Sequence, residues 1–374
     1  MPELSGKHAL LQMFQAEGVE YIFGNPGTSE SPILHTLESF PELRYILVAQ
    51  EGVAMGMADA YARSSGIPAF VNLHIETGLA NGISLLQNAR DGGTPMVITA
   101  GNKDSRELAH GRTNLSEMVQ QFTKWSAEIN HPAQIPYAVR RAFKEAKTPP
   151  TGPTFLSFSA DSLDGQAEVE IIASGQNRFE IGPDPLAIEE AAKLLASSAS
   201  PILLVGDRLA SASGSKAAIR LAEHIGARVY SPFYAEMSFP TCHPQYLGMI
   251  RLGYRETLPL LSQSDVVVVV GKILSFFYMF SNPNLRYFDV KSRLIHVDSD
   301  PQELGRSQPT EVSILAHPRV ALEQLYYSVR KKMSKSAFRV PSENTLIGFV
   351  TTSYPLPHTG ATDRWCSNRP AKSA

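Results

Sequence analysis

Residues 45–62 constrain the fold more than any other stretch of the chain. Residues 45–49 form a short apolar run, which is typical of a buried strand, and small and apolar residues follow at helical spacing. One carboxylate, Glu51, stands at the junction. Ligands of open α/β sheets bind at such junctions, although the helix dipole alone also favours an acid in a first turn. Glu51 is therefore a candidate site residue that needs support from its neighbours.

The strand-then-helix pattern recurs through the first part of the chain. Further strands are predicted at residues 21–23, 69–73, 95–99 and 154–158. Helices are predicted at residues 8–15, 32–39, 78–89, 116–125 and 136–147. Strands joined by helices pair in parallel with right-handed crossovers, so the fold class expected here is α/β with a doubly wound parallel sheet.

In such a sheet the carboxyl ends of the parallel strands share one edge, and ligands bind in the crevice there. This edge should gather the turn at residues 24–28, Glu51, His74, Gly78 and Gly101. Each of these residues also has a purely structural explanation. Gly27 permits a turn, Thr28 caps a helix, and a lone histidine such as His74 is often a satisfied structural imidazole.

A second unit of the same kind follows. Helices are predicted at residues 185–195, 215–224 and 320–331, with strands at residues 201–206, 228–230, 265–271 and 294–298. This second Rossmann-like unit contains no Gly-x-Gly-x-x-Gly motif, so the sequence does not support a nicotinamide site. Residues 166–183 are predicted to be a linker, and residues 333–374 are predicted to be an irregular tail.

Composition excludes several classes of partner. The formal net charge is -2 and there is no dense Lys/Arg block, so neither nucleic acid nor an anionic membrane is an expected partner. The most apolar window, residues 266–280, is shorter than the ~20 residues that span a bilayer, and the N-terminus does not resemble a secretory signal. Cys242 and Cys366 form neither a disulfide framework nor a metal spacing, which indicates a reducing, cytoplasmic location.

Three segments in order, residues 18–28, 50–62 and 72–74, resemble the pyrimidine-binding domain of thiamine diphosphate-dependent enzymes, and most closely that of the benzoylformate decarboxylases. Residues 294–301 are similar to the central domain that these enzymes share with acetolactate synthases. The resemblance implies a pyrimidine-binding domain at residues 1–165 and a central domain at residues 184–332.

The resemblance also implies roles for single residues. In this family the glutamate that matches Glu51 hydrogen-bonds N1′ of the cofactor and promotes loss of the thiazolium C2 proton. His74 matches a histidine that relays protons, and Thr28 takes the position of a serine that binds the substrate carboxylate. The same resemblance assigns the walls of the cofactor pocket to Pro26, Gly27, Gly78 and Asn81.

Two departures from the family pattern bear on activity. Tyr278 stands where the benzoylformate enzymes have a further histidine, which bears on the choice of keto acid. The family holds Mg²⁺ and the diphosphate with a third domain that carries Gly-Asp-Gly, and this chain has no such string. We therefore expect no metal ligands here, and Mg²⁺ only through a C-terminal domain absent from this chain.

The leading hypothesis is a thiamine diphosphate-dependent 2-keto acid decarboxylase or carboligase, C-terminally truncated and inactive alone. An acetolactate synthase-like transferase is one alternative, and a non-catalytic remnant that dimerises or binds a partner is another. Because active sites in this family form between subunits, we expect a homo-oligomer that acts on a small 2-keto acid.

Overall fold

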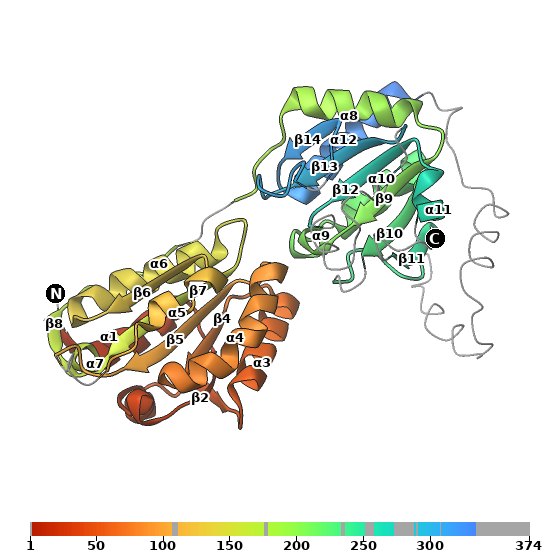
Figure 1. Cartoon of the computed structure of the whole chain (residues 1–374). Coiled ribbons are helices and arrows are strands. Elements are labelled where there is room, and N and C mark those ends of the chain that lie inside the picture. Colours follow the sequence, from red (N-terminus) through yellow and green to blue (C-terminus); the bar gives the residue numbers. More distant parts are fainter. Residues whose placement is uncertain are drawn as a thin grey trace, which may run out of the picture. The chain divides into compact units, whose positions relative to one another are not determined.

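The computed structural model describes residues 2–106, 111–175, 179–232, 236–250, 258–272, 288, 291–306 and 308–333. Tyr278, Cys366 and the predicted tail from residue 334 onward lie outside the described residues. The chain divides into two compact units, Met1–Phe179 and Glu180–Ala374 (Figure 1). Each unit is built around its own parallel sheet, so the predicted pair of doubly wound sheets is confirmed.

The sheet of the first unit has six parallel strands in the order β3-β2-β4-β5-β7-β6. Its strands are β2 (Tyr21–Asn25), β3 (Arg44–Leu47), β4 (Ala69–Leu73), β5 (Met96–Asn102), β6 (Trp125–Ile129) and β7 (Pro153–Ser159). A separate antiparallel pair joins β1 (Glu3–Ser5) to β8 (Gln166–Glu168). Strand β8 lies inside the segment that was predicted to be a linker.

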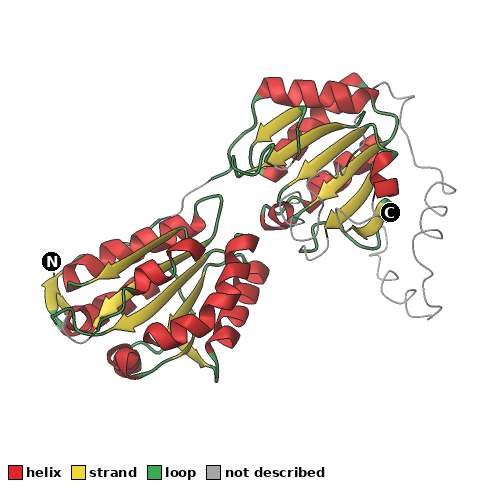
Figure 2. Ribbon diagram, viewed as in Figure 1, coloured by secondary structure: helices red, strands yellow, loops and turns green. Residues whose placement is uncertain are grey.

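Helices cover both faces of this sheet (Figure 2). The α-helices are α1 (Gly6–Ala16), α2 (Ser31–Thr36), α3 (Glu51–Ser65), α4 (Ile75–Gly92), α5 (Leu115–Met118), α6 (Ile135–Lys147) and α7 (Ala160–Asp164). The 3-10 helices are η1 (Thr28–Glu30), η2 (Leu37–Ser39), η4 (Gln120–Phe122) and η5 (Pro132–Gln134). Successive strand residues point to opposite faces, so Phe70 packs with α1 and α6, whereas Val71 packs with α3 and α4.

The order of the strands places a ligand crevice. From β2 the chain moves outward to β3, and it then returns to add β4, β5, β6 and β7 on the other side, with β6 at the edge. The order therefore reverses between β2 and β4, and in open α/β sheets ligands bind at this reversal, beyond the carboxyl ends of the strands. The turn after β2 and His74 after β4 flank that position.

Two predictions about strands at the sheet edges were wrong. Residues 45–49 were predicted to be a buried strand, but β3 is an edge strand, and the Leu47 side chain is 70% exposed. Residues 116–125 were predicted to be one helix, but α5 and η4 are short, and residues 125–129 form the edge strand β6. An edge strand is only half buried, so its hydrophobic pattern is weak.

The sheet of the second unit has six parallel strands in the order β11-β10-β9-β12-β13-β14. Its strands are β9 (Pro201–Val205), β10 (Arg228–Pro232), β11 (Tyr246–Ile250), β12 (Val266–Val270), β13 (Arg293–Asp298) and β14 (Val312–Leu315). Its described helices are α8 (Pro185–Ser197), α9 (Asp207–Ser211), α10 (Ser215–Ile225), α11 (Leu258–Ser262) and α12 (Pro318–Lys332). The sequence pattern did not predict the edge strands β11 and β14.

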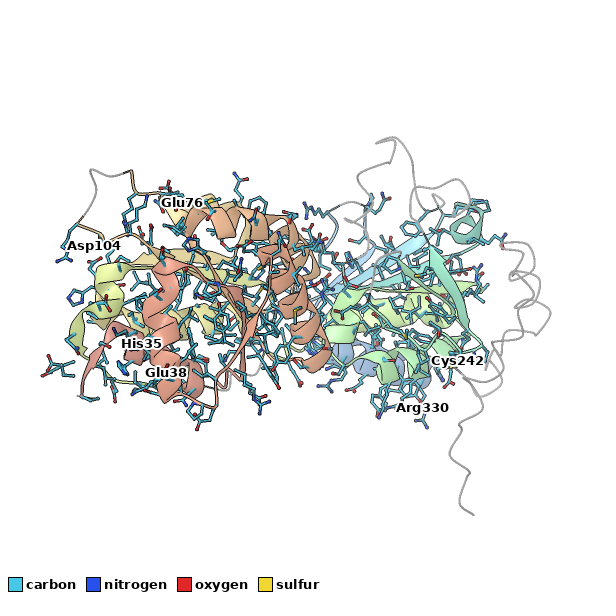
Figure 3. All side chains as sticks on the ribbon, turned by 90° about the horizontal axis from the view of Figure 1, so that it is seen from below. His35, Glu38, Glu76, Asp104, Cys242 and Arg330 are labelled. Carbon is cyan, nitrogen blue, oxygen red and sulfur yellow. The ribbon has the colours of Figure 1, made fainter. Side chains whose placement is uncertain are left out.

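Two further observations concern the surface. Cys242 is exposed and free of any disulfide (Figure 3). Within the described part of the chain, no helix is both long enough and apolar enough to cross a bilayer.

Candidate functional site

The candidate site lies at the carboxyl edge of the first sheet, and Glu51 is its central carboxylate. Glu51 is the first residue of α3, and the helix begins there because the side chain of Gln50 caps it by accepting from the Val53 backbone N–H. Only 7% of Glu51 is exposed. The helix start therefore fixes an almost buried carboxyl group beside the crevice.

Two amide side chains from different elements hold the Glu51 carboxylate. Asn25 Nδ2, at the end of β2, donates to Glu51 Oε1 at 3.0 Å, and Asn81 Nδ2, on α4, donates to Glu51 Oε2 at 3.0 Å. Burial raises the pKa of Glu51, but these hydrogen bonds and the nearby His74 outweigh it, so the net pKa is lowered from its ordinary value. Glu51 is consequently ionised at neutral pH.

Two glycines allow His74 and Glu51 to come close to the backbone. A Cβ added to Gly27 would lie 2.3 Å from His74 Nδ1, and a Cβ added to Gly78 would lie 3.1 Å from Glu51 Oε1. A side chain at position 27 would overlap the imidazole, and one at position 78 would crowd the Glu51 carboxylate. Thr28, the remaining predicted catalytic residue, opens η1 and is exposed.

The sequence pattern did not indicate Glu30, yet its carboxylate contacts the ends of three strands, β2, β4 and β5. Its carboxylate is completely buried. Oε2 accepts from Gly27 N at 2.9 Å and contacts His74 Nδ1 at 2.8 Å, while Oε1 accepts from Gly101 N at 2.7 Å. Because this carboxylate accepts from its surroundings, His74 Nδ1 carries the donated proton, and a neutral imidazole keeps its lone pair on Nε2. The sequence offers one signal for Glu30, its place three residues after Gly27. In the structure Gly27 caps η1, and the Glu30 side chain accepts from the Gly27 backbone N–H, as in a capping box.

A second polar chain supports the strands beneath the site. Tyr45 donates from its hydroxyl to Asn72 Oδ1 at 3.2 Å, and Asn72 Nδ2 donates to Thr99 Oγ1 at 3.0 Å. Burial raises the pKa of Tyr45, and the negative charge of Glu30 raises it further. Tyr45 therefore stays neutral and acts as a fixed donor below the crevice.

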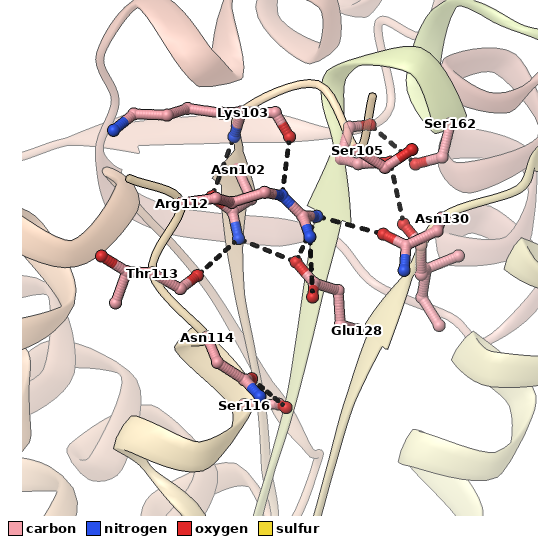
Figure 4. A network of polar contacts seen from close by, with 12 residues as sticks. Asn102, Lys103, Ser105, Arg112, Thr113, Asn114, Ser116, Glu128, Asn130 and Ser162 are labelled. Atoms are coloured by element: carbon pink, nitrogen blue, oxygen red, sulfur yellow. Dashed lines mark hydrogen bonds and ion pairs between the residues drawn. The ribbon is translucent and has the colours of Figure 1, made fainter. Parts of the chain in front are cut away.

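A polar network fastens the segment after β5 to the same edge (Figure 4). Asn102 Nδ2 donates to Glu128 Oε1 at 2.7 Å and to the Thr113 carbonyl at 3.0 Å. The Arg112 side chain, 9% exposed, pairs with Glu128 and also donates to the Lys103 carbonyl. The segment after β5 is thus tied to the ends of β5 and β6 through Lys103, Arg112 and Thr113.

A shallow groove of about 620 Å³ lies over α3 and α4, and its lining includes Gln50 and Gly52 but not Glu51. Its lining includes the exposed side chains of Val53 and Met57. Among the residues that the structure describes, no three or more His, Cys, Asp or Glu side chains gather in a way that could hold a metal ion.

Gly27 offers a test of the site's geometry. Replacing Gly27 with alanine should lower the free energy of unfolding by about 1–3 kcal/mol, because the new Cβ overlaps the His74 ring and pushes it away from Glu30. The matched control is Gly56→Ala on α3, whose Cβ would meet only Leu85 at an ordinary 3.4 Å. This control should be neutral or stabilising by about 0.5–1 kcal/mol. Urea unfolding measures both, and a Gly27→Ala protein as stable as the wild type would contradict the geometry.

Two family models match the chain. The model described as "Thiamine pyrophosphate enzyme, N-terminal TPP binding domain" matches residues 4–123, and the one described as "Thiamine pyrophosphate enzyme, central domain" matches residues 188–325. The first match contains Glu30, Glu51, His74 and the glycines around them. The second match falls in the second unit.

Individual proteins that are similar to this chain point to the same family as the two models. The benzoylformate decarboxylase of Pseudomonas aeruginosa is 32% identical over 330 residues, which are 86% of this chain and 61% of that protein. A probable acetolactate synthase large subunit of Methanocaldococcus jannaschii is 28% identical over 86% of this chain and 56% of that protein. The solved thiamine diphosphate-dependent 4-hydroxybenzoylformate decarboxylase of Rhodococcus jostii superposes with a TM-score of 0.80 at 26% identity, over 90% of this chain and 64% of that one. The chain thus spans about three fifths of the length of the relatives it matches.

Proposed function

This chain belongs to the thiamine pyrophosphate-dependent enzymes, and from that premise we propose that it carries the pyrimidine-binding half of a 2-keto acid decarboxylase or carboligase of the benzoylformate decarboxylase type. One observation carries the proposal. The ionised carboxylate of Glu51 is nearly buried at the strand-order reversal, where it is held by two amide side chains and packs closely against Gly78.

The residues present fit the aminopyrimidine of thiamine diphosphate. Glu51 offers the carboxylate that a ring nitrogen requires, and the amides of Asn25 and Asn81 hold that carboxylate in place. Side chains at positions 27 and 78 would displace the imidazole and crowd the acid, so glycine at both positions keeps these two groups in place. Pro26, Gly27, Gly78 and Asn81 would line the walls around the ring.

When bound, thiamine diphosphate supplies a carbon nucleophile for the keto group and an electron sink for the electron pair that stays behind when carbon dioxide departs. Glu51 orients the ring and exchanges a proton with it, which an amide could not do. His74, whose Nδ1 is held by Glu30, would relay a proton through Nε2 to the oxygen of the former keto group and take it back when the product forms. Thr28, exposed on the turn, donates its hydroxyl to the substrate carboxylate.

The proposal assigns Mg²⁺ and the diphosphate to protein outside these two units, and it includes a homo-oligomer. The groove over α3 and α4 offers a surface for a second copy of the chain, because the exposed side chains of Val53 and Met57 would be stabilised by burial. We further propose a cytoplasmic location, in keeping with the free thiol of Cys242.

Turnover of two substrates tests the reaction. A chain completed with the remaining part of the Pseudomonas aeruginosa relative should release carbon dioxide from benzoylformate faster than it forms acetolactate from pyruvate. The opposite preference would favour an acetolactate synthase-like transferase. The similarity to the Methanocaldococcus jannaschii relative is the reason to consider this alternative. Inactivity on both substrates would reject both assignments.

A non-catalytic binding role is the remaining alternative, and it is motivated by the partial coverage of the relatives. Calorimetry of the chain with thiamine diphosphate and Mg²⁺ separates the cases. We expect feeble binding by this chain alone and much tighter binding by the completed protein. Equally feeble binding by both would favour the non-catalytic role.

A further inference from the structure

We propose that Ile75 is a positioning residue whose left-handed backbone turns the His74 imidazole onto Glu30. This inference rests on the proposed function in one respect, which is that the proposed function assigns proton transfer to His74. The geometric part concerns the chain alone, and it can be tested without cofactor.

The backbone of Ile75 is strained. Its φ is 31°, and among the described residues the one other non-glycine residue with positive φ is Ser213, at 52°. L-residues avoid this region because Cβ crowds the following carbonyl oxygen, and a β-branched side chain such as isoleucine tolerates it least. A strained residue persists only where its surroundings over-determine the conformation, and such residues cluster at functional sites.

The surroundings of Ile75 supply that constraint. Its side chain is 9% exposed and belongs to the apolar cluster that contains Phe23 and Leu79. Its backbone N–H points at Glu30 Oε1, 3.5 Å away, while the ring of the preceding residue, His74, contacts Glu30 Oε2 at 2.8 Å. The ring and the following N–H therefore face the same buried carboxylate.

The chain path explains why strain is needed at this point. Strand β4 ends at Leu73 and helix α4 begins at Ile75, so His74 is the single residue between them. A strand that turns into a helix within one residue must take an unusual dihedral nearby, as at the strained strand-to-helix elbow that displays the nucleophile of α/β-hydrolases. Here the turn displays the imidazole, which packs against Gly27 so closely that a Cβ there would overlap it.

A pair of variants isolates the backbone effect from the loss of the side chain. Ile75→Ala and Ile75→Gly both remove the buried side chain, and they differ mainly in their tolerance of positive φ. Glycine normally stabilises a helix less than alanine does, but in the left-handed region the order reverses. We expect the Ile75→Gly protein to melt about 2–4 °C above the Ile75→Ala protein. Ser213→Gly and Ser213→Ala should show the same order, far in sequence from the imidazole.

The second measurement is ¹⁵N NMR of the His74 ring nitrogens. If Ile75 only stabilised the fold, its replacement would not change these signals. Glycine adopts the left-handed backbone without strain, so in Ile75→Gly the His74 Nδ1 signal should match that of the wild type. In Ile75→Ala the strain remains but the packed side chain that holds the backbone is gone, so the backbone should leave the left-handed region, release the ring from Glu30 and shift or broaden that signal. Neither Ser213 variant should change it. An alanine variant that melts at or above the glycine variant, or an unchanged Nδ1 signal in Ile75→Ala, would overturn the proposal. Both readouts are taken without thiamine diphosphate, so they stand or fall separately from the turnover assays.

Discussion

Replacing Glu30 with alanine is expected to lower the free energy of unfolding of the first unit by about 3–5 kcal/mol. The carboxylate is fully buried and accepts from the Gly27 and Gly101 backbones and from His74. Its removal leaves these donors without an acceptor, and buried unpaired polar groups are costly. Urea denaturation of the whole chain, followed by a probe in the first unit, measures the change.

A matched control separates this effect from the general loss of a glutamate. Glu38 in the nearby η2 is exposed (Figure 3), so Glu38→Ala should change stability by no more than about 0.5 kcal/mol. The loss of stability in Glu30→Gln should lie between those of Glu30→Ala and Glu38→Ala. The amide keeps one acceptor oxygen, but its NH₂ group faces donors that it cannot pair with. Equal destabilisation by Glu30→Ala and Glu38→Ala would show that Glu30 does not join the strand ends as described.

Replacing Glu51 with glutamine is expected to lower kcat of the completed enzyme by about 10²–10⁴-fold, the usual contribution of a positioned proton-transfer group. The amide can still accept from Asn25 or Asn81 through its oxygen, so the fold should survive, but it cannot take up a proton. Steady-state kinetics on the preferred keto acid provides the measurement, and thermal unfolding confirms that the variant is folded.

The control for this loss of activity is Glu38→Gln, which removes a carboxylate from an exposed position. It should leave kcat within about twofold of the wild type, since a surface substitution of this kind touches no reacting group. If Glu51→Gln retained the activity of that control, Glu51 would have no part in proton transfer.

The sequence predicted the central strands well and the edge strands poorly. Residues 69–73 were predicted to be a strand, and β4 has those bounds, because a strand covered on both faces is mostly apolar; of its five residues Asn72 alone is polar. Strand β6 was missed because its first four residues are only partly buried, so polar and apolar residues mix. At the edges of a sheet, pairing is set by neighbours that are distant in sequence.

The same distinction holds for the site. Glu51 and His74 were found because each directly follows a recognisable strand or begins a helix, so topology alone puts them on one edge. Asn25 was placed at this edge only as part of the turn at residues 24–28, and Glu30 was missed, because the contacts of both depend on which strand ends become neighbours. Glu30 reaches Gly101, 71 positions along the chain, and no local pattern reports such a contact.

The proposed function requires the Glu51 carboxylate to act on the aminopyrimidine of thiamine diphosphate. Deuterium exchange at C2 of the bound cofactor, compared between the completed wild-type enzyme and its Glu51→Gln variant, measures this action without the later steps of turnover. We expect exchange in the variant to be slower by about 10²–10⁴-fold, in proportion to its loss of kcat. Equal exchange rates in the two proteins, with the cofactor bound to both, would contradict the claim.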